Sequence, residues 1–274
     1  MLTAVLRDAL KNNSAEARLD VAALELAAIE FPGLDFEAPL FRLDNFAEQI
    51  QSRLKPSASG LEFIKVLNLY LFDHFQFRGN DGEYYDPRNS CLNSVISRRM
   101  GIPISLSVVY IEIARRLSRP VAGIGLPGHF IVSYTDGNAR HFIDPFHSGR
   151  VLSFDDCRAL ALETAGVDVG MDPDFLQPVG NRQILIRMLT NLKTIYIRGR
   201  ALDKARQVLD LLIHAEPENA EDYRVRGLIH VQQLKHRAAK TDLETYLHLA
   251  PAAPERHQVE QQLILIERWK AGLN

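Results

Sequence analysis

The chain of 274 residues has 32 lysines and arginines against 34 aspartates and glutamates, and 46% of its residues are hydrophobic. It therefore has the apolar content for a packed core, but it lacks the positive charge expected of a bulk nucleic-acid binder. No apolar run approaches roughly 18 residues, so we expect no membrane span, and charge from Arg7 onward argues against a signal peptide. Two cysteines are too few for a disulfide framework, which favours a cytoplasmic location.

The first 80 residues favour helices. Apolar residues recur at spacings of three and four in the segments 21–31, 43–54 and 61–75. Pro32-Gly33 and the segment 56–60 separate these runs with residues that form turns. The sequence therefore predicts a helical N-terminal part.

Two further helices are predicted in the middle of the chain. Segment 89–101 favours a helix that ends at Gly101. Its N-cap would be Asn89 or Ser90. Pro103 then begins a second helix, since a proline in the first turn sacrifices no hydrogen bond. Both faces of that second helix are apolar, so we expect it to be buried.

Short β-branched and aromatic runs follow, at 121–126, 129–135 and 140–146. Asp136-Gly137-Asn138 predicts a turn between the last two runs. We expect an α+β arrangement in which the buried helix backs an antiparallel sheet.

From about Asn181 the pattern is helical and repeats every 34 residues. The repeat pairs Pro217 with Pro251, Ala205 with Ala239, and Leu209 with Leu243. This period is typical of tetratricopeptide repeats, in which each unit is a pair of helices. The sequence predicts two copies and a final helix over 257–269, joined to the first domain by the segment 167–180.

The predicted hairpin brings one histidine and one aspartate together. His129 lies at the mouth of one strand, and Asp144 ends the strand that the turn pairs with it. A carboxylate that accepts a hydrogen bond from an imidazole fixes its tautomer and raises its basicity. We therefore predict a hydrogen bond between His129 and Asp144. To form a catalytic site, this pair lacks only a nucleophile.

The order of these elements resembles the transglutaminase-like core of cysteine proteases and peptide N-glycanases. The segments 86–117, 125–130 and 142–150, with the repeat-containing tail, are similar to the bacterial SirB family. The resemblance covers nearly the whole chain. It implies a papain-like α+β core with a helical N-terminal segment over residues 1–170, followed by an all-α tetratricopeptide-like domain over 181–274. The family is described as regulatory.

The position of the expected nucleophile departs from the enzymes of this fold. Active transglutaminase-like enzymes begin the buried helix with Gly-x-Cys, and the matching residues here are Gly101-Ile102-Pro103. Ser105 is about 200° around the helix from the proline, so its hydroxyl would point away. Ser107 lies one turn deeper, and we expect its hydroxyl to bond to the carbonyl four residues back.

Two cysteines remain as thiol candidates. Cys91 lies at the beginning of a predicted helix, where the helix dipole favours thiolate. Its helix, however, places it roughly 14 Å from the turn that presents Pro103, so we predict that the Cys91 sulfur lies more than about 8 Å from His129. Cys157 is predicted to be a core residue.

A metal site is a further possibility. His141, Asp144 and His147 are spaced by three residues, and with His129 they would offer zinc four ligands. Odd spacings on a strand point to opposite faces, so His141 and Asp144 would diverge unless the chain bends at Pro145. We therefore expect no metal, and a polar network in which Asp144 holds His129 and His147 helps to cap the following loop.

The sequence also contains a basic run between residues 182 and 206. Its members are Arg182, Arg187, Lys193, Arg198, Arg200, Lys204 and Arg206. Such a run is either a solvated helix face or a positive surface for an acidic peptide.

Together these features favour a non-enzymatic regulatory or interaction protein, with a degenerate transglutaminase-like fold and a tail that binds a protein or peptide. We expect no cofactor, no membrane contact and no nucleic acid. The alternative is a cysteine-dependent hydrolase or acyltransferase that uses Cys91, His129 and Asp144. A third hypothesis is a metal-dependent hydrolase.

Overall fold

The computed structural model describes residues 4–11, 18–137, 139–170 and 173–270. Its contacts divide the chain into two compact units, residues 1–191 and 192–274, and we describe each by itself. Within the described residues, no helix is long and apolar enough to cross a membrane.

The N-terminal part of the first unit is helical, as its periodicity predicts. Its helices are α1 (Ala4–Lys11), α2 (Leu19–Ala27), α3 (Glu37–Gln51), α4 (Gly60–Asn68) and a π-helical extension of α4 (Leu69–His74). The hydroxyl of Ser59 caps α4 by accepting the backbone N–H of Glu62.

The next helix, α5 (Leu92–Arg98), begins later than predicted. A separate 3₁₀ turn over Pro87–Asn89 precedes it, and the carboxylate of Asp86 caps that turn. The prediction of Asn89 or Ser90 as the N-cap of α5 was therefore wrong. Both residues belong to the preceding turn, and Cys91 occupies the N-cap position.

The C-terminal end of α5 also differs from the prediction. Arg99 ends the helix in the left-handed region with a φ of 61°, and its guanidinium lies 4.3 Å from the centre of the Phe46 ring. The predicted end at Gly101 was wrong, because that residue belongs to a short strand, β2 (Met100–Gly101). This strand pairs in parallel with β1 (Arg78–Gly79).

The central helix α6 (Pro103–Arg116) begins at the predicted proline. All of its residues from Pro103 to Ala114 are buried, as the apolar pattern on both faces predicts. It contacts β3 and β4 and so supports the sheet that carries the candidate site.

The sheet has five antiparallel strands in the order β6-β5-β4-β3-β7. Their bounds are β3 (Val121–Ile124), β4 (Ile131–Asp136), β5 (Ala139–Asp144), β6 (Arg150–Leu152) and β7 (Pro178–Val179). Strands β4 and β5 form the predicted hairpin, although Asn138 of its turn lies outside the described residues. The segment 167–180, predicted to connect the two domains, contains β7, which pairs with β3 and forms one edge of the sheet.

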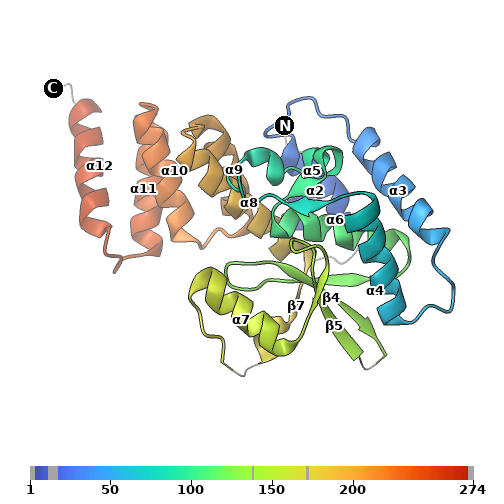
Figure 1. The fold of residues 1–274 in the computed structure, drawn as a ribbon. Helices are drawn as coiled ribbons and strands as arrows, with labels where there is room; N and C mark the ends of the chain where they lie inside the picture. The colour runs from blue at the N-terminus through green and yellow to red at the C-terminus, as the bar shows by residue number, and fades with distance from the viewer. Residues whose placement is uncertain (1–3, 12–17, 138, 171–172, 271–274) are drawn as a thin grey trace. The chain divides into compact units, whose positions relative to one another are not determined.

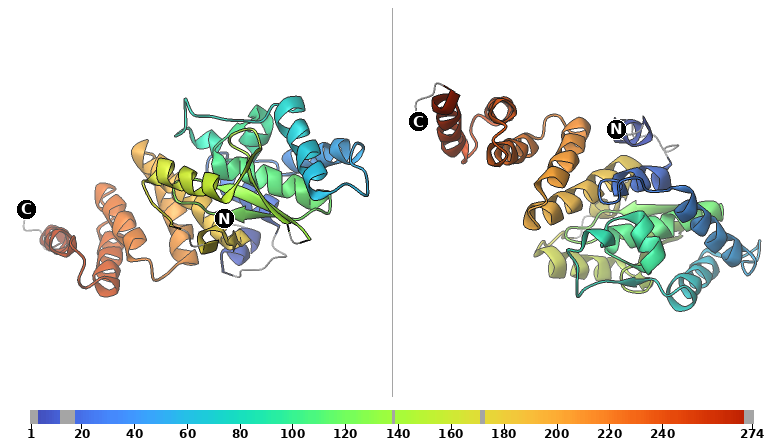
Figure 2. Two further views of the ribbon diagram at one scale, coloured as in Figure 1. Left: turned by 60° about the horizontal axis from the view of Figure 1, so that its bottom comes forward. Right: turned by 90° about the horizontal axis from the view of Figure 1, so that it is seen from above.

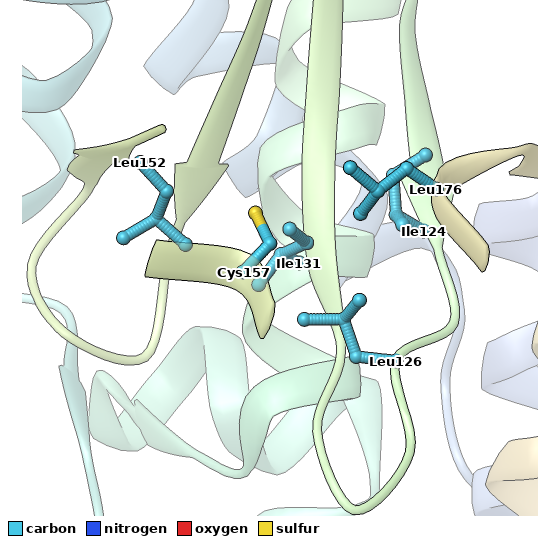
Figure 3. Close-up of a cluster of buried hydrophobic side chains, with 6 residues drawn as sticks. All are labelled: Ile124, Leu126, Ile131, Leu152, Cys157 and Leu176. Atoms are coloured by element: carbon cyan, nitrogen blue, oxygen red, sulfur yellow. The ribbon is translucent and has the colours of Figure 1, made fainter. Parts of the chain in front are cut away.

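Helices α6 and α7 (Phe154–Ala165) cover opposite faces of this sheet (Figure 1). On the α7 side lies a compact apolar cluster of Ile124, Leu126, Ile131, Leu152, Cys157 and Leu176 (Figure 3). Cys157 is completely buried in this cluster, which confirms the prediction that it is a core residue.

The second unit consists of the helices α9 (Leu202–Ala215), α10 (Ala220–Gln232), α11 (His236–Leu249) and α12 (Arg256–Lys270), with the end of α8 (Asn181–Arg198) before them. From α9 onward each helix contacts the next along the chain, and Figure 2 shows them as a row of neighbours.

The 34-residue repeat is visible in the packing of this unit. Helices α9 and α11 have equal length, and the residues paired by the repeat are fully buried in both: Ala205, Leu209, Ala239 and Leu243. The turns that precede these helices each contain one residue with a positive φ, Arg200 at 54° and Leu234 at 58°. Gly227 lets α10 approach α11 closely, because an added Cβ would lie 2.7 Å from Leu243.

Candidate functional site

The histidine and aspartate predicted to meet across the hairpin are hydrogen-bonded. His129 lies in the loop between β3 and β4, and Asp144 is the last residue of β5. The His129 Nε2 atom is 3.0 Å from Asp144 Oδ2, and the two residues are 4% and 1% exposed. The register that pairs Val132 with Ile143 brings both residues to the same end of the sheet.

A second imidazole contacts the same carboxylate oxygen. His147 Nδ1 lies 2.7 Å from Asp144 Oδ2, and its side chain is 53% exposed. The ring of His147 stacks on that of His129, with 5.7 Å between their centres. His147 was predicted to help cap the following loop: its carbonyl accepts the backbone N–H of Arg150 at 3.2 Å, and its ring turns back onto Asp144.

Four hydrogen bonds hold the Asp144 carboxylate. Besides the two imidazoles on Oδ2, the backbone N–H groups of Phe146 and His147 donate to Oδ1 at 3.0 and 3.3 Å. Burial by itself would raise the pKa of Asp144, but the bonds from His129 and His147 outweigh it and lower that pKa. The carboxylate is therefore ionised and fixed in orientation.

These three side chains could together hold a metal ion. The ligand atoms of His129, Asp144 and His147 all lie within 4.8 Å of one another. His141 does not belong to the group, because it pairs with Tyr134 in the middle of the hairpin. The four-ligand set considered from the sequence is thus not assembled, but a smaller set of three is.

Arg187, on α8, holds the backbone around His129. Its Nη2 atom donates to the carbonyls of Leu126 and His129 at 2.7 and 2.6 Å, and its guanidinium lies 5.4 Å from the centre of the Phe130 ring. Burial lowers the pKa of Arg187. Sequence analysis missed this role, although a cation inside the apolar segment 184–189 is a signal that it is not simply solvated.

The basic run that contains Arg187 is not one exposed surface. Arg182 donates to the carbonyl of Leu10 at 2.8 Å, and Lys193 pairs with the buried Asp222 at 2.6 Å. Arg206 pairs with a carboxylate on its own helix. Arg198 and Arg200 are exposed, so the solvated helix face predicted as one reading describes only part of the run, and the reading as a positive surface for an acidic peptide stays a prediction.

The start of α6 has no exposed nucleophile. Pro103 is its first residue, and the hydroxyl of Ser105 donates to the carbonyl of Asn89 and accepts the N–H of Ile102. Ser107 is buried, and its hydroxyl has no hydrogen-bond partner among the described residues. The predicted bond from Ser107 to the carbonyl four residues back was wrong, which leaves a buried hydroxyl unsatisfied.

Both thiols are buried. Cys91 is the N-cap residue of α5 and is 0% exposed, and its helix packs on α2, α3 and α6. Cys157 is also 0% exposed, and burial raises the pKa of its thiol to about 12. The separation of the Cys91 sulfur from His129 stays a prediction.

Two pockets are lined by described residues of the second unit. One, of about 650 Å³ between α10 and α11, has Lys235 and Arg237 exposed at its rim, and Arg226 beside Asp242 within it. Arg226 is neutralised, because it pairs with Asp242 at 2.6 Å and with Asp210 at 2.8 Å. The other pocket, of about 600 Å³, is mainly apolar, with Ile197, Leu202, Val225, Leu228 and Ile229 in its lining.

Comparisons with known proteins agree with this two-part architecture. Residues 38–190 match the transglutaminase-like superfamily, and residues 192–264 match a tetratricopeptide repeat family. The chain is 36% identical over 236 residues to a UPF0162 protein of Xylella fastidiosa, with 84% of each chain covered. It is 32% identical over 246 residues to a UPF0162 protein of Pseudomonas aeruginosa, with 88% of each covered. F-box only protein 21 of Mus musculus is 27% identical over 172 residues, which are 58% of this chain and 26% of that protein.

Proposed function

Because this chain belongs to the UPF0162 (SirB-like) family and joins a transglutaminase-like domain to tetratricopeptide repeats, we propose that it is a non-enzymatic regulatory protein that binds a protein partner. The observation that supports this proposal is that both thiols are completely buried, although the His129–Asp144 hydrogen bond is present. Acyl transfer needs a thiolate that the substrate can reach. The proposal includes a cytoplasmic location and no organic cofactor.

Thiol labelling tests the non-enzymatic part of the proposal. Native protein at neutral pH should react with iodoacetamide far more slowly than protein unfolded in guanidinium chloride, because both cysteines are 0% exposed. Peptide mapping identifies any labelled residue. Rapid labelling of Cys91 that disappears in a His129→Ala variant would contradict the proposal and establish the alternative, a cysteine-dependent hydrolase or acyltransferase.

The second unit supplies the partner-binding surface in this proposal. Lys235 and Arg237 are exposed at the rim of one pocket, and neither has a carboxylate among the partners that the structure records for it. The second pocket offers apolar side chains to a ligand. A segment with both acidic and apolar residues is complementary to these two pockets, since tetratricopeptide units bind peptides through side-chain pockets on paired helices.

A charge-reversed variant tests the binding surface. The probe is a fluorescein-labelled peptide of alternating glutamate and leucine, and its anisotropy is measured with the full chain at increasing salt. Lys235→Glu with Arg237→Glu should weaken binding, whereas Arg53→Glu with Lys55→Glu, an exposed pair at the same spacing in the first unit, should not. Binding should also weaken with salt, because exposed charges are screened within about 8 Å at physiological ionic strength. Equal effects of both double variants would refute this assignment.

A further inference from the structure

We propose that His129, Asp144 and His147 bind one transition-metal dication of the zinc class. Each residue offers a ligand atom within 4.8 Å of the others, and Asp144 Oδ2 lies between His129 Nε2 at 3.0 Å and His147 Nδ1 at 2.7 Å. Imidazole nitrogens and a carboxylate oxygen are ordinary zinc ligands. Within the described part of the chain, no second group of three such residues meets this spacing.

The separations of the ligand atoms suit a metal after a small adjustment. Zinc bonds of about 2.0–2.2 Å in tetrahedral geometry place ligand atoms roughly 3.3–3.6 Å apart. Asp144 Oδ2 now lies 3.0 Å from His129 Nε2 and 2.7 Å from His147 Nδ1. The distance from Asp144 Oδ2 must therefore grow by about 0.3–0.6 Å to His129 and by about 0.6–0.9 Å to His147, whose half-exposed side chain has room to move.

Neighbouring hydrogen bonds hold the other two ligand residues, His129 and Asp144, in place. Backbone N–H groups occupy Asp144 Oδ1, so the carboxylate presents Oδ2 to the two imidazoles. Arg187 fixes the backbone of His129 through its carbonyl. Such outer hydrogen bonds orient metal ligands and are part of most working metal sites. His129 and Asp144 are thus preorganised, and His147 closes the site from the solvent side.

Three protein ligands leave at least one coordination position open. That arrangement is typical of catalytic zinc, which activates a bound water, and differs from closed structural sites with four protein ligands. Metal binding here is independent of partner binding by the second unit. If the chain binds metal, the metal-dependent hydrolase is favoured among the hypotheses drawn from the sequence. The rate of thiol labelling tests a different property, the accessibility of the cysteines, and does not depend on metal binding.

Metal titration of the full chain tests the proposal. Protein freed of metal with a chelator is titrated with Zn²⁺ by calorimetry and with Co²⁺ by visible absorption. We expect one ion per chain, with the Co²⁺ bands of a four- or five-coordinate site and no sulfur charge-transfer band. His147→Ala should bind at least about 100-fold more weakly, since losing even an outer partner of a metal ligand costs 10–100-fold.

His141→Ala is the matched control, because this histidine lies on the same hairpin but outside the ligand group. It should bind Zn²⁺ within about twofold of the unchanged chain. Circular dichroism and thermal melting check that both variants fold. If the unchanged chain binds no more tightly than His147→Ala, or if His141→Ala loses as much affinity, the three residues form only a hydrogen-bonded cluster and the proposal is wrong.

Discussion

Replacing each of the three clustered residues by alanine, with chelator present, should lower stability in a definite order. Asp144→Ala should be the most destabilising variant, His129→Ala intermediate and His147→Ala the mildest. The order follows from the number of buried partners that each replacement leaves unsatisfied. Asp144 accepts four hydrogen bonds, whereas each imidazole donates one to it.

The magnitudes follow from burial. Asp144→Ala leaves the N–H of Phe146 and the imidazole of His129 without an acceptor in a buried site, and each unsatisfied donor costs about 1–3 kcal/mol. Losing the buried charge offsets part of this cost, so we expect a loss of about 3 kcal/mol in the free energy of unfolding. His129→Ala leaves the carboxylate with three donors and should cost about 2 kcal/mol. His147→Ala should cost less than about 1 kcal/mol, because the side chain is 53% exposed.

Urea denaturation followed by circular dichroism measures these differences. The slope of the free energy with urea should stay constant across the series, so that changes in midpoint report stability. A result in which His147→Ala costs as much as Asp144→Ala would refute the reasoning, because it would mean that burial does not set the energy of this cluster. A loss below about 1 kcal/mol for Asp144→Ala would have the same meaning.

Three further predictions concern other parts of the chain. Arg187→Met should destabilise the protein by about 1–3 kcal/mol in urea, because two carbonyls lose their donor, while the exposed Arg198→Met should stay within about 0.5 kcal/mol. Burial alone would raise the pKa of Asp20, but hydrogen bonds from two arginines lower it to about 2. The resulting stabilisation of about 2 kcal/mol is present above pH 4 and is lost as the pH falls toward 2, so Asp20→Asn should flatten the measured stability over that interval. Gly227→Ala should lower the melting temperature of the protein, since its Cβ would lie 2.7 Å from Leu243, and an unchanged melting temperature would contradict the close packing of α10 on α11.

Much of the fold could be predicted from local patterns. The apolar periodicity located the N-terminal helices, and Pro103 marked the first residue of the buried helix. The 34-residue period identified the paired helices of the second unit. The turn after Asp136 was enough to bring His129 to Asp144, because an antiparallel hairpin determines which residues lie opposite one another.

Other features depend on contacts that no local pattern encodes. Arg187 is held by two carbonyls of a loop about 60 positions earlier in the chain, and Lys193 is held by the buried Asp222, 29 positions later. His147 turns back onto Asp144 because the chain bends immediately after β5. Periodicity and turn residues act over a few neighbours, so the sequence by itself determined the elements and the hairpin. The partners of buried charges were decided only by the tertiary structure, since a buried charge is stable only beside groups that the folded chain brings to it.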